Sequence, residues 1–158
     1  MALTNGSFAR LPGIAAAAVL IGIASVSPAH VTVSPKESSP GAWQKYELRL
    51  PNEEKVATTA LEVRFPAGLR VMSFEDKPGW TVEPLRDSSG AITGARWTGQ
   101  LAPERFVELG IIAVNPKSGT GLVFSAKQMF ADGTAVNWSG PAGSSTPAPR
   151  VSLKPVSR

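Results

Sequence analysis

The 158-residue sequence contains no cysteine and a single histidine. Without thiols the chain cannot form a disulfide framework, a zinc ribbon or an iron–sulfur cluster. A single imidazole excludes sites that need two, such as the His-x-x-x-His zinc site of metalloproteases. Charged residues make up only 18% of the chain, and its 16 Lys and Arg residues form no run. The net charge of +4 is therefore too scattered to indicate nucleic-acid binding.

Residues 1–29 have the pattern of a secretory signal peptide. Arg10 is the only charged residue in this segment, and an apolar stretch from Leu11 to Val26 follows it. Small residues occupy the −3 and −1 positions of a cleavage site after Ala29. The alternative is a retained membrane anchor, but the stretch is short for a span and contains one proline and two glycines. We expect cleavage, which leaves a mature chain of 129 residues that begins at His30.

The rest of the chain consists of short runs in which apolar and polar residues alternate, separated by proline and glycine. Between Trp43 and Leu50, for example, Tyr46, Leu48 and Leu50 form an apolar face, and charged residues form the other. Further runs cover residues 60–65, 69–74, 80–83, 92–98, 106–114, 122–130 and 135–138. No window combines helical periodicity with a capped start. The pattern predicts an all-β protein of seven to nine strands, an antiparallel two-sheet β-sandwich with an immunoglobulin/cupredoxin-like layout.

The composition changes at Ser139, where a segment rich in glycine, proline and serine begins. We therefore expect three parts: a cleaved signal peptide over residues 1–29, a sandwich over 30–141 and a Pro/Ser-rich C-terminal arm over 142–158. Residues 151–153 could add a final strand.

Cleavage after Ala29 would give His30 a free α-amine beside its imidazole. The amine and Nδ1 can close a chelate ring around one metal ion, and the amine has a low intrinsic pKa of about 7.7. Two nitrogens with oxygen ligands suit tetragonal Cu(II), whereas zinc prefers more His or Cys and calcium prefers oxygen alone. A histidine near a terminus can equally be a solvated residue. The strand expected from Val31 would hold this one to the sheet.

An oxygen ligand would complete such a site. Glu53 and Glu54 follow Pro51 and Asn52, where a strand ends and a loop begins, so they are better placed to reach the terminus than carboxylates within strands. Glu47 remains a candidate.

The four tryptophans raise the same question of packing against function. For Trp43, Trp80 and Trp97, which lie in or at the start of predicted strands, core packing is the expected role. Trp138 lies near a strand end, before a polar loop, and could either join the core or cover a metal site.

Several motifs of the mature chain recur together in one known family. They are His30-Val-Thr-Val-Ser-Pro35, Tyr46-Glu-Leu-Arg-Leu-Pro-Asn-Glu53, Ala57-Thr-Thr-Ala-Leu-Glu-Val-Arg-Phe-Pro66, Pro78-Gly-Trp80, Asn115-Pro-Lys117 and Asp132-Gly-Thr followed by Trp138-Ser-Gly-Pro141. In their order and spacing, residues 30–153 resemble the YcnI-like family of bacterial copper-binding domains.

The resemblance implies a β-sandwich that binds one Cu(II) per chain through a single-histidine brace. It implies that His30 supplies the amine and imidazole nitrogens, that Glu53 supplies a carboxylate oxygen and that the Trp138 indole packs close to the copper. It also implies a copper chaperone or scavenger in copper uptake or homeostasis, with copper transporters or copper-resistance proteins as partners.

Many family members carry a C-terminal hydrophobic helix, but this sequence ends at Arg158 without one. We therefore expect a periplasmic or secreted protein with no membrane anchor after cleavage. Oxidative copper enzymes with an N-terminal histidine need a second imidazole, so we expect no enzyme activity and no catalytic residue. The alternative is a metal-free adhesion or carbohydrate-binding sandwich, with exposed Trp43 or Trp80 as the stacking platform.

Overall fold

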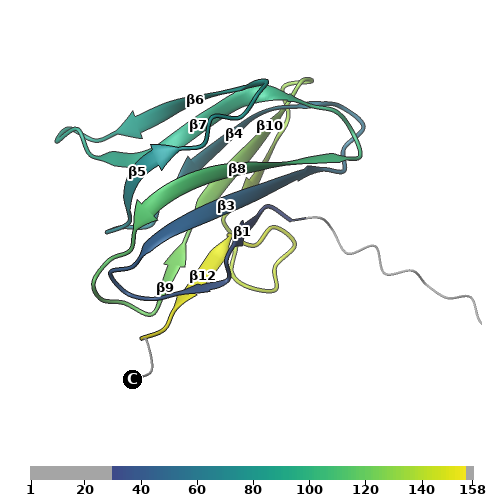
Figure 1. The fold of residues 1–158 in the computed structure, drawn as a ribbon. Coiled ribbons are helices and arrows are strands. Elements are labelled where there is room, and N and C mark those ends of the chain that lie inside the picture. Colours follow the sequence, from purple (N-terminus) through teal and green to yellow (C-terminus); the bar gives the residue numbers. More distant parts are fainter. Residues whose placement is uncertain (1–29, 156–158) are drawn as a thin grey trace, which may run out of the picture.

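The computed structural model describes residues 30–155, and the predicted signal peptide lies outside them (Figure 1). The described residues form twelve strands. The strands are β1 (Thr32–Ser34), β2 (Glu37–Ser38), β3 (Trp43–Asn52), β4 (Thr58–Arg64), β5 (Arg70–Phe74), β6 (Trp80–Arg86), β7 (Ile92–Leu101), β8 (Arg105–Val114), β9 (Gly121–Val123), β10 (Ser125–Phe130), β11 (Ala135–Trp138) and β12 (Arg150–Leu153). Within this range no helix is long and apolar enough to cross a membrane.

Two main sheets pack against each other, which confirms the predicted all-β sandwich (Figure 1). One has the strand order β1-β3-β8-β5, and the other has the order β11-β10-β4-β7-β6. A small third sheet, β2-β12-β9, extends one end of the sandwich. Pairing is antiparallel except between β2 and β12. Because β1 and β11 are both edge strands, His30, which precedes β1, and Trp138 lie at edges of their sheets.

The core follows from the alternation in the sequence. In β3, Tyr46, Leu48 and Leu50 are fully buried, as the pattern predicts. They join Leu61 and Trp97 of the facing sheet in one continuous apolar cluster. Burying a side chain of this size contributes roughly 1.5–3 kcal/mol. Since the chain has no disulfide, this cluster supplies the main stabilisation of the sandwich.

The alternating run over residues 122–130 is two strands rather than one. The chain passes from β9 in the small sheet to β10 in the five-stranded sheet, and Phe124 between them is fully buried. The Phe124 N–H donates to the Pro149 carbonyl (2.9 Å) instead of to a sheet neighbour. Alternation alone cannot reveal this change of sheet because the burial pattern continues through it. The final strand suggested at residues 151–153 is present as β12, with Val151 and Leu153 buried.

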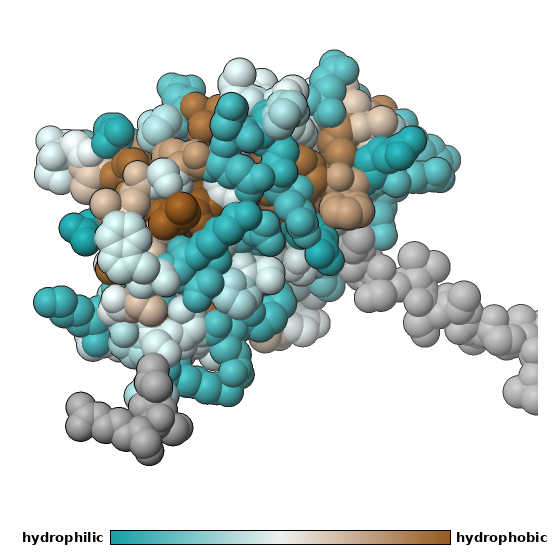
Figure 2. Space-filling view, viewed as in Figure 1, coloured by the Kyte–Doolittle hydropathy of each residue, from teal (hydrophilic) through white to brown (hydrophobic). Residues whose placement is uncertain are grey.

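The expected core role of Trp43 is wrong: its side chain is 64% exposed. Trp43 is in phase with Lys45 and Arg49 on β3, opposite to the buried face that begins at Tyr46. Figure 2 views the molecule from the side of β3 and β8, and hydrophilic side chains dominate this surface with hydrophobic ones exposed between them. Trp97 is buried as expected.

The packing of Trp80 depends on a glycine. Trp80 is half-buried and packs against the core from its cross-strand position opposite Gly99. A Cβ at Gly99 would lie 2.4 Å from the Trp80 indole, so no side chain fits beneath this ring.

A buried polar network closes the end of the sandwich near β2. The Tyr46 hydroxyl donates to Asn115 Oδ1 (2.7 Å), and Asn115 Nδ2 donates to the Ser38 hydroxyl (2.9 Å) and the Ser39 carbonyl (2.8 Å). Asn115 and Tyr46 are almost completely buried. The network therefore holds the turn before β3 against β8 without help from solvent.

Replacing Tyr46 with phenylalanine tests this network. Tyr46→Phe leaves Asn115 Oδ1 buried without its donor, so we expect the free energy of unfolding to fall by about 1–3 kcal/mol in urea denaturation. A matched Tyr46→Leu variant, which also loses ring volume, should lose more. Equal stability of Tyr46→Phe and the unchanged protein would contradict the role of the hydrogen bond.

Candidate metal centre

His30 is held at the start of edge strand β1. Pairing with β3 sets Thr32 opposite Arg49, and continuing this register by two residues brings His30 level with Pro51. The adjacent Val31 is 1% exposed and anchors the segment in the core. His30 is therefore fixed close to the point where β3 ends and Glu53 follows.

The imidazole of His30 packs against the indole of Trp138. The ring centroids are 5.6 Å apart, and the planes are tilted by 59°. His30 Nε2 is buried and has no hydrogen-bond partner. Burying a polar nitrogen without a partner is unfavourable, so such atoms mark places where a ligand, ion or water completes the structure. Packing of the ring holds His30 in position.

Trp138 reaches this position through the β10–β11 hairpin. Its turn contains Asp132 and Gly133, whose φ of 86° is in the left-handed region that suits glycine. Asp132 accepts hydrogen bonds from the backbone N–H (2.9 Å) and hydroxyl (2.7 Å) of Thr134. These bonds lower the pKa of Asp132, so the carboxylate that closes the turn stays ionised at neutral pH. The hairpin then sets Trp138 opposite Ala126.

The buried side chain of Gln128 connects Trp138 to the other sheet. Gln128 Oε1 accepts from the Trp138 indole N–H (3.1 Å). Its Nε2 donates to the Pro51 carbonyl (2.9 Å) and to the Thr58 hydroxyl (2.8 Å). The amide thus joins the indole to the residue of β3 that is level with His30. Gln128 was not predicted from the sequence. Its position midway between Ala126 and Phe130, on the apolar face of the strand, could have indicated that it is buried.

Glu53 and Glu54 lie at the end of β3, in a loop held by Asn52. Asn52 is buried, and its Nδ2 donates to the carbonyls of Val56 and Leu101 (both 2.9 Å). Its Oδ1 accepts from the Glu54 N–H at 3.0 Å. Asn52 was also missed, because sequence alternation does not distinguish a buried asparagine from one in an exposed turn.

One cavity brings Trp138 and the glutamate loop together. Its volume is about 220 Å³, and Glu53, Glu54, Gln128 and Trp138 are among the residues that line it. His30 contacts the same indole and lines a neighbouring cavity. Both glutamates are exposed at the rim. The structure therefore places His30, Trp138 and the Glu53–Glu54 loop in one region.

Glu47 lies elsewhere. It pairs with Ser34 and Gly110 in the sheet, four residues before Pro51, a distance along the strand of roughly 13 Å. It accepts a hydrogen bond from Lys45 at 2.9 Å. Glu47 is therefore not brought to His30.

The donors gathered here are one imidazole and the carboxylates of the loop. No group of three or more His, Asp or Glu side chains that could hold a metal occurs within residues 30–155. Metal binding at His30 therefore requires a further donor. The backbone nitrogen of His30 provides one only when the chain begins there, because a free amine has a lone pair that a peptide nitrogen lacks. With that amine the set fits Cu(II), for which nitrogen and oxygen ligands are suitable.

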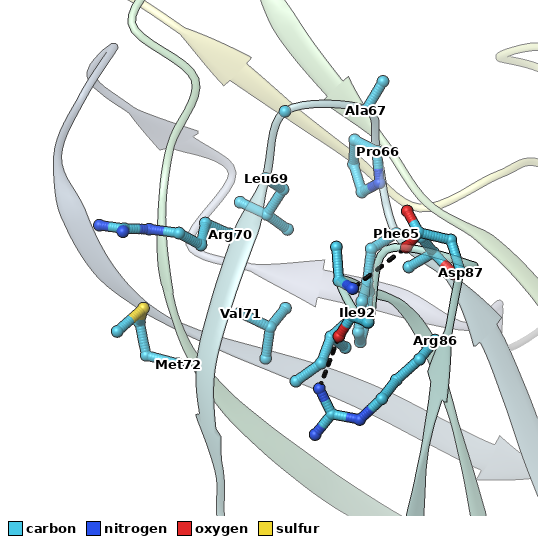
Figure 3. Close-up of a pocket in the computed structure, with 14 residues that line it drawn as sticks. Phe65, Pro66, Ala67, Leu69, Arg70, Val71, Met72, Arg86, Asp87 and Ile92 are labelled. Atoms are coloured by element: carbon cyan, nitrogen blue, oxygen red, sulfur yellow. Dashed lines mark hydrogen bonds between the residues drawn. The ribbon is translucent and has the colours of Figure 1, made fainter.

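A large cavity elsewhere in the molecule is a separate feature. It encloses about 640 Å³ between β5 and the β6–β7 hairpin and is lined by Phe65, Leu69, Val71 and Ile92 among others (Figure 3). Arg86 at its edge donates to the Gly90 carbonyl at 2.9 Å. It shares no lining residue with the region around His30.

Two relatives resemble this chain closely enough to inform the site. The copper-binding protein CutI of Bacillus subtilis (strain 168) is 31% identical over 121 residues. The match covers 75% of this chain and 59% of CutI, so the chain spans less than two thirds of that relative's length. A crystal structure of a Nocardia farcinica protein with an immunoglobulin-like fold is 27% identical, with a TM-score of 0.68, and the match covers 78% of this chain and 97% of that chain.

The family assignment comes from the region described above. Residues 30–153 match the family described as "Domain of unknown function (DUF1775)". This match begins at His30 and includes Glu53, Gln128 and Trp138. The chain belongs to this family, the YcnI-like family that its sequence motifs resemble.

Proposed function

We propose that the protein is exported, begins at His30 after cleavage and binds one Cu(II) per chain. In this proposal the His30 amine and imidazole and the Glu53 carboxylate are the ligands, and Trp138 shields one side. The similarity to copper-binding protein CutI supports copper as the ion. The donor set supports Cu(II), since it offers nitrogen and oxygen but no thiolate.

The observation that carries the proposal is the packing of His30 against Trp138 beside the cavity that Glu53 lines. The chain has only one histidine, and its ring contacts an indole that lines the same cavity as the carboxylate loop.

The position of the site suits carrying copper rather than catalysis. The glutamates lie exposed at the rim, where a partner can reach the ion. With one imidazole in the whole chain, the site lacks the second ring that oxidative copper enzymes use. We therefore assign the protein a chaperone or scavenger role in the periplasm or outside the cell, with a copper transporter or copper-resistance protein as its partner.

A metal-free carbohydrate-binding module is the second candidate, and the exposure of Trp43 favours it. Phe106 is equally exposed, but it pairs near the opposite end of β3 and lies under the Arg49 guanidinium. A single open ring is a small platform for a sugar chain. Selective uptake of one Cu(II) separates the two candidates.

The first test concerns the chelate of His30. We expect His30→Ala to weaken Cu(II) binding by more than about 100-fold in competition titrations, because an imidazole ligand is lost. A second variant with one alanine inserted before His30 keeps the ring but moves the amine away. It should lose affinity similarly, with unchanged stability. Full affinity in the insertion variant would contradict the N-terminal chelate.

The second test identifies the carboxylate. We expect Glu53→Gln to weaken Cu(II) binding by at least about tenfold and to change the electron paramagnetic resonance spectrum of the copper. Glu54→Gln is the matched control, since both residues lie at the rim of one cavity. If Glu54→Gln alone changes the spectrum, the ligand is Glu54.

The third test uses the tryptophan fluorescence of the protein, which bound Cu(II) quenches at short range. We expect Trp138→Phe to remove most of the quenching that one equivalent of Cu(II) causes. Trp80→Phe is the control, because β6 lies at the opposite edge of the same sheet from β11. Trp138→Phe also leaves Gln128 Oε1 without its donor, which should lower stability by about 1–3 kcal/mol. Equal quenching in both variants would place the copper elsewhere.

A further inference from the structure

The cavity that His30 itself lines is basic. It has a volume of about 320 Å³, and its charged lining residues are Lys36 and Arg150, with no carboxylate among them. The turn that includes Ala142 and Gly143 closes another part of the wall. Figure 1 shows the loop before β12 beside the start of β1. His30 therefore lines a basic cavity. Its ring also contacts Trp138, which lines the cavity of Glu53 and Glu54.

The two cations are positioned by the fold. The Ser152 N–H donates to the Lys36 carbonyl at 2.8 Å, which ties the segment after β1 to β12, where Arg150 lies. The Arg150 guanidinium is within 3.4 Å of the Gly140 carbonyl, a neutral acceptor. The nearby Glu37 is paired with Lys154. Neither Lys36 nor Arg150 is in an ion pair within the described residues.

The electrostatic environment of Lys36 agrees with this geometry. Partial burial and, secondly, the Arg49 guanidinium lower its pKa, although the side chain remains open to solvent. Lys36 is partly dehydrated and lies near another positive charge, so an anion that enters the cavity would stabilise its charged form. Positive charge converging on a concave surface also raises the local concentration of anions.

We propose that this cavity binds the carboxylates of a small anionic chelator that carries Cu(II), so that copper reaches His30 as a chelate. The inference rests on the proposed function. Free Cu(II) would be repelled by Lys36 and Arg150, whereas a polycarboxylate complex with net negative charge would be attracted. The chelator's carboxylates would contact the two cations while its copper faces His30 from the same cavity.

The transfer is a ligand exchange that leaves copper in the +2 state. Copper–oxygen bonds to the chelator break as copper–nitrogen bonds to the His30 amine and imidazole form. The proton of the α-ammonium passes to water, and the chelator leaves with its carboxylates ionised. No oxidant or reductant is required.

The test compares two copper donors by stopped-flow fluorescence. The exported protein, with its start at His30 checked by intact mass, is mixed with Cu(II)–citrate, which is anionic, or with Cu(II)–bis(glycinate), which is neutral. We expect the double variant Lys36→Gln/Arg150→Gln to take copper from citrate about tenfold more slowly at low salt and from glycinate at an unchanged rate. High salt should reduce the difference, since screening acts over about 10 Å at 0.1 M.

A matched control removes the same charge elsewhere. Arg70 lies on β5, at the opposite edge of the sheet from β1, and Lys117 is exposed in the loop after β8. Arg70→Gln/Lys117→Gln should leave both rates unchanged. If the Lys36/Arg150 variant slowed copper uptake from both donors equally, or from neither, the proposed chelator site would be wrong. The proposal that the protein binds copper would still stand. Failure of the unchanged protein to take copper from glycinate would overturn the proposed function itself.

Discussion

The buried amide of Gln128 determines how the two sheets meet at the candidate site. Its Nε2 bonds to Pro51 in one sheet and Thr58 in the other, and its Oε1 holds the Trp138 indole. Leaving any one of these polar groups buried without its partner would lower the free energy of unfolding by about 1–3 kcal/mol. This amide therefore favours one arrangement of β3 against β10 and β11. This arrangement positions His30, which is level with Pro51. It also positions the loop that contains Glu53.

The same arrangement separates charge around His30. The glutamate-lined cavity offers carboxylates to a metal ion, whereas the cavity bordered by Lys36 and Arg150 offers cations to an anion. The indole of Trp138 contacts His30 and lines the acidic side. Under the proposed transfer, the copper complex enters the basic cavity, and the carboxylates of the adjacent cavity are near the His30 ring through Trp138. Such a division would allow a metal complex to bind intact before its ligands exchange.

Most of the fold was predictable from alternation, because a strand buried on one face repeats its pattern every two residues. Trp43 shows where the method fails, since a large ring was assigned to the core although its phase on β3 points outward. His30, Glu53 and Trp138 were found through motifs, and the fold brings them to one region. Asn52, Gln128, Lys36 and Arg150 were missed because their roles arise from contacts between distant segments, which local patterns do not encode.

A site built on the first residue of a mature chain depends on cleavage for its chemistry. Before cleavage, the nitrogen of His30 is a peptide nitrogen without an available lone pair, and a single imidazole with one or two carboxylates binds copper weakly. After the proposed cleavage, the α-amine and imidazole would bind as one chelate, and the amine would give up its proton easily because its intrinsic pKa is about 7.7. Under the proposed function, the fold holds the ring and the carboxylates ready. The loss of the leader then adds the missing donor. Under the proposed function, copper loading would in this way be confined to the compartment where the leader is removed, and one histidine would suffice.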